Sequence, residues 1–151
     1  MKLTDHFSLA EFERSDLAVR MGIDNSVPEA LFDTLRYTAS MLEGVRSAVL
    51  HGPIQISSGY RCLELNRALK SKDTSDHVKG LAVDFTCPTF GSPLEVCTAI
   101  VASDIDFGQV IFEFGRWCHL SFPAPGGFGK RQVLTIDRRG TRAGLPITEE
   151  A

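Results

Sequence analysis

The sequence predicts an α+β domain, in which a small antiparallel sheet carries helices on one face. Helical segments with an apolar stripe occupy the first and middle parts of the chain, and three strand-like runs separated by turns come last. The chain of 151 residues is 43% hydrophobic and 23% charged, which suits one domain with a hydrophobic core. Composition alone indicates no function.

The first helices are marked by residues that favour helix starts. Ser8 and Glu11 form a capping box, which predicts a short helix over residues 8–14. Pro28 stands where a helix can begin, and apolar residues then recur at helical spacing. This pattern predicts the main amphipathic helix over residues 28–48.

The middle of the chain alternates between strands and helices. Residues 54–57 alternate in polarity and predict a strand, and a short helix is expected over residues 63–69. The apolar run 80–85 predicts a buried strand. Ser92 as a cap and Pro93 in the first turn predict another helix.

The final strands are expected to form an antiparallel meander. Their sequences are QVIFEF, WCHLSF and QVLTI, separated by a turn at Gly115 and by the loop PAPGGFGK. From Asp137 onward the chain is polar. We therefore expect a domain over residues 1–136 and a loose polar C-terminal tail over residues 137–151.

Charge and hydropathy argue against several kinds of partner. The formal net charge is -3, and no cluster of basic residues is interleaved with aromatic ones, so we expect no nucleic-acid partner. No run approaches the roughly 18 consecutive apolar residues of a membrane span. The N-terminus lacks the pattern of a secretory signal, which predicts synthesis in a cytoplasm with no signal peptide and no membrane partner.

Three residues are candidates for a metal site. Asp84 stands in an apolar strand, where a carboxylate is costly to bury unless it is paired or bound to a metal. His77 and His119 also lie in or beside predicted strands, and two imidazoles with one carboxylate are a common ligand set of catalytic zinc. The spacing alone leaves open that Asp84 bonds to backbone amides and that the histidines are unrelated.

The four cysteines give little support to a different metal site. None of them forms a C-x-x-C pair, which favours buried thiols in a reduced compartment. The one hint of a cysteine-zinc protein is Cys118, next to His119.

Three motifs occur in an order that is typical of one protein family. They are SSGYR (57–61) followed by Asn66, S-x-H-x-x-G-x-A-x-D (75–84), and W-x-H-x-S (117–121). Together they resemble the zinc D-alanyl-D-alanine carboxypeptidase family, which includes phage cell-wall endopeptidases, and most closely its short, single-domain, phage-borne branch. The resemblance covers about residues 5–136. It implies a hedgehog/DD-peptidase-like fold with Zn²⁺ bound by His77, Asp84 and His119.

The resemblance also implies an activity. The chain would be a zinc metallopeptidase that hydrolyses stem peptides of bacterial peptidoglycan, either as a D-Ala-D-Ala carboxypeptidase or as an endopeptidase of the L-Ala-D-Glu type. We expect a monomer whose partner is the stem peptide. As a phage endolysin it would reach the cell wall after release by a holin.

The resemblance assigns roles to residues around the metal. Arg61, in the SGYR motif, would hold the carboxylate or carbonyl of the substrate and serve both binding and catalysis. Ser75 and Ser121 would be donors to the substrate or to the ligands, and Trp117 would form a wall of the cleft.

The resemblance does not by itself identify the catalytic base. Better-known family members carry an acidic residue three positions before the last ligand, where this chain has Arg116. We predict Glu113 as the base, with Asp76 in reserve. A two-residue turn would send Glu113 to the other face of its strand, whereas a three-residue turn through Trp117 would place it across from His119.

Arg116 keeps an alternative function open. The chain could be a catalytically inactive module of the same fold that holds the metal and serves in cell-wall binding or phage structure. Such a module would bind zinc and peptidoglycan without hydrolysis.

Overall fold

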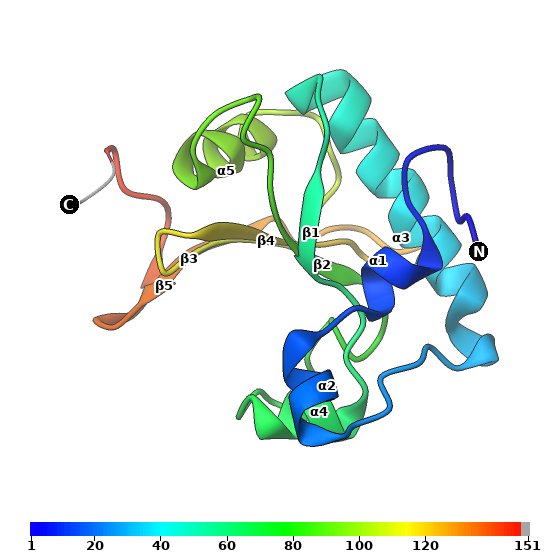
Figure 1. Ribbon diagram of the computed structural model, residues 1–151. Helices are drawn as coiled ribbons and strands as arrows, with labels where there is room; N and C mark the ends of the chain where they lie inside the picture. Colours follow the sequence, from blue (N-terminus) through cyan, green and yellow to red (C-terminus); the bar gives the residue numbers. More distant parts are fainter. Residues whose placement is uncertain (149–151) are drawn as a thin grey trace.

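The computed structural model describes residues 1–148 and shows helices packed around a sheet (Figure 1). The predicted α+β class is confirmed. Within the described residues the sheet has six strands, in the order β1-β2-β4-β3-β5-β6. They are β1 (Gln55–Ser58), β2 (Ala82–Thr86), β3 (Gln109–Glu113), β4 (Trp117–Ser121), β5 (Gln132–Asp137) and β6 (Gly140–Ala143).

The helices follow the capping signals in the sequence. Ser8 and Ser92 both form capping boxes, with Glu11 and Glu95 respectively. The helix predicted over residues 28–48 consists of three consecutive pieces, η1, α3 and the π-helical η2. The helices are α1 (Leu9–Glu13), α2 (Asp16–Met21), η1 (Glu29–Leu31), α3 (Phe32–Gly44), η2 (Val45–Leu50), α4 (Leu63–Ala68) and α5 (Pro93–Val101). Across residues 1–148, none has the length and apolar character that spanning a membrane requires.

The helix α2 was not predicted. It is capped by Ser15, whose Oγ accepts the backbone N–H of Ala18. Ala18 is the buried residue of α2, and Val19 next to it is 80% exposed. A helix this short and this exposed lacks the apolar stripe on which sequence prediction depends.

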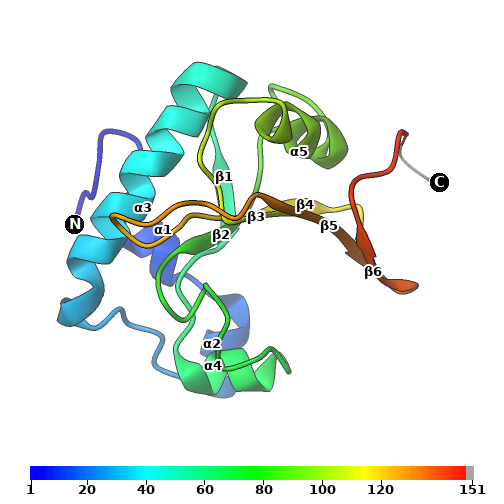
Figure 2. The ribbon, with the colours of Figure 1, turned by 180° about the vertical axis from the view of Figure 1, so that it is seen from behind.

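The hydrophobic core lies between the sheet and the helices α3, η2 and α5. Phe85 and Leu120 of the sheet pack there with Leu42 and Ile100 of the helices, all fully buried. The helices α3, η2 and α5 thus form the layer that was predicted on one face of the sheet. The helices α2 and α4 lie on the other side of the sheet, where no helices were predicted (Figures 1 and 2).

The last strands correct the predicted meander. β3 and β4 form an antiparallel hairpin, but β5 pairs with β3, in parallel, because β2 already occupies the other edge of β4. The chain therefore crosses to the free edge of β3. There Arg131 and Gln132 donate their backbone N–H groups to the carbonyls of Phe107 and Gly108, which starts β5 alongside β3.

The stretch after Asp137 is not wholly a loose tail, as was predicted. Gly140–Ala143 forms β6, which pairs antiparallel with β5 after a turn in which Gly140 has a φ of 101°. All residues of β6 are exposed, so no apolar alternation marks them as a strand. The sheet thus extends beyond residue 136, and residues 149–151 of the predicted tail lie outside the described residues.

Candidate metal centre

Two neighbouring strands place Asp84 and His119 side by side. They are direct partners in the antiparallel pairing of β2 with β4. Because side chains alternate along a strand, both point away from α5, while Val83 and Leu120 pack in the core. Asp84 is 5% and His119 is 7% exposed, so a carboxylate and an imidazole are buried together.

A tight turn before β2 brings His77 to the same place. Ser75 Oγ accepts the backbone N–H of His77 at 3.2 Å. Gly80 has a φ of 76°, in the region that favours glycine, and its carbonyl accepts the hydroxyl of Thr38 at 2.7 Å. The prediction that Gly80 turns the chain between His77 and Asp84 is confirmed.

One atom from each predicted ligand converges on a common point. Asp84 Oδ1 lies 3.0 Å from His119 Nδ1 and 3.3 Å from His77 Nε2, and the two nitrogens are 3.2 Å apart. Tetrahedral zinc with ligand distances of about 2.0–2.1 Å separates its ligand atoms by about 3.3 Å. Among residues 1–148, these residues are the one group of His, Cys, Asp and Glu side chains that could hold a metal ion. The donor set and its spacing fit zinc.

Gly59 determines which nitrogen of His77 faces this point. The carbonyl of Gly59 lies 2.6 Å from His77 Nδ1. A carbonyl can only accept, so Nδ1 carries the proton and Nε2 keeps its lone pair for a metal. A β-bulge in β1 at Ser57 shifts the strand register just before this carbonyl. Gly59 lies within the SSGYR motif, but no pattern in the sequence indicates that its carbonyl contacts His77.

Replacing Gly59 by alanine should loosen the centre. A Cβ there would lie 2.8 Å from the Cα and 3.0 Å from the carbonyl oxygen of Phe12, and backbone atoms cannot move aside as a side chain can. We expect Gly59→Ala to lower the free energy of unfolding by about 1–3 kcal/mol. We also expect the affinity for zinc to fall about 10- to 100-fold, because the contact to His77 shifts.

Urea unfolding and competition with a zinc chelator measure these two effects. Gly44→Ala is the matched control, because its Cβ would meet only Ile105 Cδ1, at 3.9 Å, and alanine favours a helix. An unchanged zinc affinity in Gly59→Ala would show that the carbonyl of Gly59 does not orient His77.

The carboxyl group of Asp84 is held in its charged form. Burial raises its pKa, but the neighbouring rings of His77 and His119, with their hydrogen bonds, outweigh burial and hold the pKa well below its ordinary value. The second oxygen, Oδ2, lies 3.6 Å from Arg61 Nη2. The charged form is the one that binds a cation.

Arg61 lies at the edge of the same centre, with 13% of its side chain exposed. Its backbone N–H donates to the carbonyl of His77 at 3.2 Å, which ties the SSGYR segment to the ligand turn. Burial lowers the pKa of Arg61, and the charges of Asp84 and Glu113 oppose that effect. The guanidinium can offer donors to a carbonyl or carboxylate beside the ligands.

Glu113 reaches the centre through a register that neither predicted turn describes. The turn consists of residues 114–116, so Glu113 pairs with Trp117, and Ile111 pairs with His119. Residues two apart share a face of the strand, which puts Glu113 on the face of His119. Its Oε1 lies 3.7 Å from His119 Nδ1, close enough for a base that serves this centre.

The comparison with known families gives a result that agrees with this geometry. The peptidase M15 family model matches residues 5–121, the stretch that contains the three candidate ligands, Arg61 and Glu113. The chain belongs to the peptidase M15 family. The predicted resemblance to the zinc D-alanyl-D-alanine carboxypeptidase type is therefore confirmed at the level of the family. A search of the curated proteins found no match.

In this M15 peptidase, neither the residue at the usual acidic position nor the reserve carboxylate is placed as well as Glu113 to act as the base. Arg116 is exposed in the hairpin turn. Asp76, the reserve candidate, lies 3.8 Å from Lys79 Nζ in an ion pair. Glu113 is the carboxylate outside the ligand set that lies beside His119.

The structure gives different surroundings to the three residues that were predicted, besides Arg61, to bind substrate. Ser75 supports the turn of His77, and Trp117 is half-buried opposite Glu113. The Trp117 Nε1–H has no partner of good hydrogen-bond geometry among residues 1–148, although its proximity favours the charged form of Glu113. Ser121 corrects the prediction, because it is fully buried and its Oγ accepts the backbone N–H of Gln109. Such a serine supports the sheet and presents no surface to a substrate.

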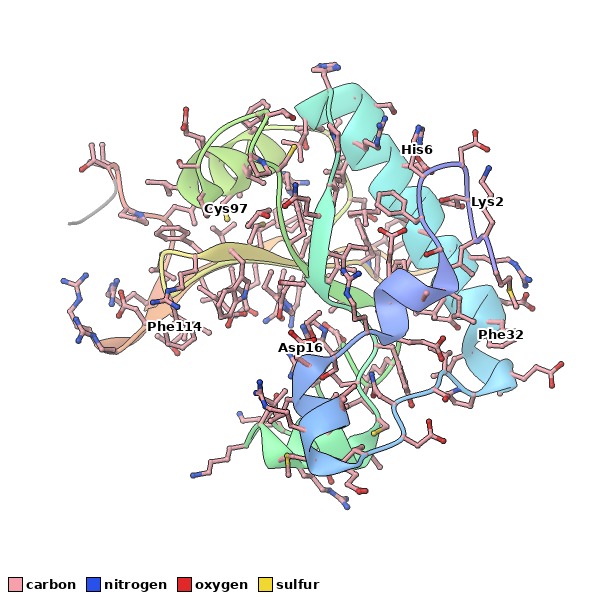
Figure 3. All side chains as sticks on the ribbon, viewed as in Figure 1. Lys2, His6, Asp16, Phe32, Cys97 and Phe114 are labelled. Carbon is pink, nitrogen blue, oxygen red and sulfur yellow. The ribbon has the colours of Figure 1, made fainter. Side chains whose placement is uncertain are left out.

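Cys118 does not belong to the metal centre of this M15 peptidase. Side chains alternate along β4, so Cys118 points to the core, where it contacts Cys97. Cys97 lies on the side of α5 that faces the sheet (Figure 3). Burial and the contact with Cys97 raise the pKa of the Cys118 thiol well above its ordinary value, which disfavours the thiolate that a metal needs.

Glu113 should destabilise the metal-free protein at neutral pH. Burial and the charge of Asp84 raise its pKa, against the opposing charges of His119 and Arg61. The folded state therefore holds the proton more tightly than the unfolded chain does. As the pH rises from the unfolded pKa through the raised folded pKa, stability is lost. We expect Glu113→Gln to be more stable than wild type at pH 8 and to lose this advantage at pH 4.

Urea unfolding of both metal-free proteins at the two pH values measures this effect. A difference in stability that is the same at pH 4 and pH 8 would show that the charge of Glu113 is not its cause.

Proposed function

We propose that the protein is a zinc-dependent peptidase that hydrolyses peptide bonds in the stem peptides of bacterial peptidoglycan. Membership of the M15 family supports a metallopeptidase. The observation that carries the proposal is the convergence of His77 Nε2, Asp84 Oδ1 and His119 Nδ1 within 3.0–3.3 Å of one another. Glu113 and Arg61 flank these atoms on the same face of the sheet.

Each flanking residue suits one task in hydrolysis. A zinc ion at the three ligands would supply a Lewis acid for the scissile carbonyl and make water a better nucleophile near pH 7. Glu113, beside His119, takes a proton from the attacking water and returns it to the departing amine. Arg61 holds the carbonyl oxygen or a carboxylate of the substrate with its paired N–H donors.

The substrate and setting follow from the family resemblance. We propose either D-Ala-D-Ala carboxypeptidase or L-Ala-D-Glu-type endopeptidase activity, in a monomer that meets the cell wall as a phage endolysin after holin-type release. Peptidoglycan is then the partner, and nucleic acid and membrane are not.

Digestion of purified peptidoglycan, followed by mass spectrometry of the released products, tests the proposal. Release of D-alanine would identify a carboxypeptidase, and new N-terminal D-glutamate would identify the endopeptidase. Bound zinc and bound peptidoglycan without any product would refute the peptidase and favour the inactive cell-wall module. The reason to consider that module is Arg116, which stands where better-known family members carry an acidic residue.

A further inference from the structure

Asn66 of α4 is a fully buried polar residue to which the proposed chemistry assigns no role. Both ends of its side chain are used. Oδ1 accepts Nη1–H of Arg61 at 3.1 Å, and Nδ2 donates to the carbonyl of Lys72 at 2.8 Å. An asparagine offers an acceptor and a donor on one short side chain, and both are satisfied here.

The contact with Asn66 is the shortest of the side-chain contacts of Arg61. Nε donates to Ser58 Oγ at 3.4 Å, and Nη2 lies 3.6 Å from Asp84 Oδ2. Ser58 and Asp84 belong to paired strands of the sheet, whereas Asn66 approaches from α4. A long arginine side chain loses much rotamer freedom when it is fixed, so a hydrogen bond to a fully buried partner is well placed to fix it.

The other end of Asn66 controls the loop that leads to His77. Its Nδ2 holds Lys72, and its backbone carbonyl accepts the N–H of Ser71. Ser75, in the same loop, then supports His77. One buried side chain thus connects the guanidinium with the chain segment that carries a metal ligand.

We propose that Asn66 is a positioning residue, which holds the Arg61 guanidinium beside Asp84 so that its free donors face the substrate. This inference rests on the proposed function for its kinetic consequence alone. The position of Arg61 itself can be measured without catalysis.

Nuclear magnetic resonance of the zinc-loaded full chain tests the position. The Nε–H signal of Arg61 is assigned by its loss in Arg61→Lys, and its heteronuclear NOE reports whether the side chain is rigid. We expect a rigid Arg61 in wild type and a mobile Arg61 in Asn66→Ala. Thr135→Val is the matched control, since it removes another buried hydrogen bond, from Oγ1 to the Gly144 carbonyl, and should leave Arg61 rigid.

A double-mutant cycle tests the kinetic role. A hydrogen bond to a charged group is worth enough that Asn66→Ala should lower kcat/KM about tenfold or more. In an Arg61→Ala background the same change should cost less than about twofold, because Asn66 acts through Arg61. An Asn66 that only supports the fold would give the same loss in both backgrounds.

The outcomes separate this inference from the proposed function. A rigid Arg61 in Asn66→Ala overturns the role of Asn66 whether or not the protein is active. Equal kinetic losses in both backgrounds overturn it as well. An inactive wild type with the expected NOE pattern overturns the peptidase and leaves the positioning of Arg61 supported.

Discussion

His77→Ala is expected to lose its bound zinc and, with it, at least about 10³-fold in the rate of peptide release. The substitution removes Nε2, which lies 3.2 Å from His119 Nδ1 and 3.3 Å from Asp84 Oδ1. Two ligands then remain, too few for the three-ligand catalytic site. Elemental analysis of the purified protein gives the zinc content, and mass spectrometry of digested peptidoglycan gives the rate.

Two control variants make this result specific. His6→Ala removes a histidine that pairs with Glu43 at 2.7 Å, away from the centre. Cys118→Ala removes the thiol that a cysteine-zinc site would need. Both should keep one zinc per chain. Zinc retained in His77→Ala, or lost in Cys118→Ala, would show that the metal is held elsewhere.

The grouping of His77, Asp84 and His119 could be predicted from the sequence because it depends largely on local patterns. An aspartate in an apolar run is costly to bury without a partner, and alternation along strands puts Asp84 and His119 on one face once their strands pair. The spacing of these residues alone left open the possibility that the two histidines are unrelated to each other. The order of the three motifs pointed to one family, and the structure brings the three side chains together as a group that could hold a metal ion.

The features that were missed depend on long-range packing or on unusual turns. β5 lies parallel to β3 because β2 occupies β4, and no local pattern encodes that competition. The register of Glu113 depends on a turn in which Phe114 has a φ of 53°, a conformation that aromatic residues rarely adopt. Asn66 follows the SSGYR motif in the sequence, yet its contact with Arg61 appears only when α4 packs beside the centre.

Glu113→Gln is expected to lower kcat about 10²- to 10⁴-fold while the protein keeps its zinc. Glutamine has the size of glutamate but cannot accept the proton of the attacking water. The three ligand atoms belong to other residues, so the zinc content should stay at that of wild type. Initial rates on a peptidoglycan-derived peptide, with elemental analysis of the same samples, measure both quantities.

The pH dependence of the rate gives an independent test of the same role. A base works when it is deprotonated, so the wild-type rate should rise with pH as Glu113 loses its proton. Burial and the charge of Asp84 raise the pKa of Glu113 in the metal-free chain, and the charge of a bound zinc ion would oppose that shift, so the rise itself is the expected result. Glu113→Gln should lack this rise, and Asp76→Asn should keep both the rate and the profile. If Asp76→Asn loses the rate and Glu113→Gln does not, the base lies on the ligand turn, and the hairpin serves only to hold His119.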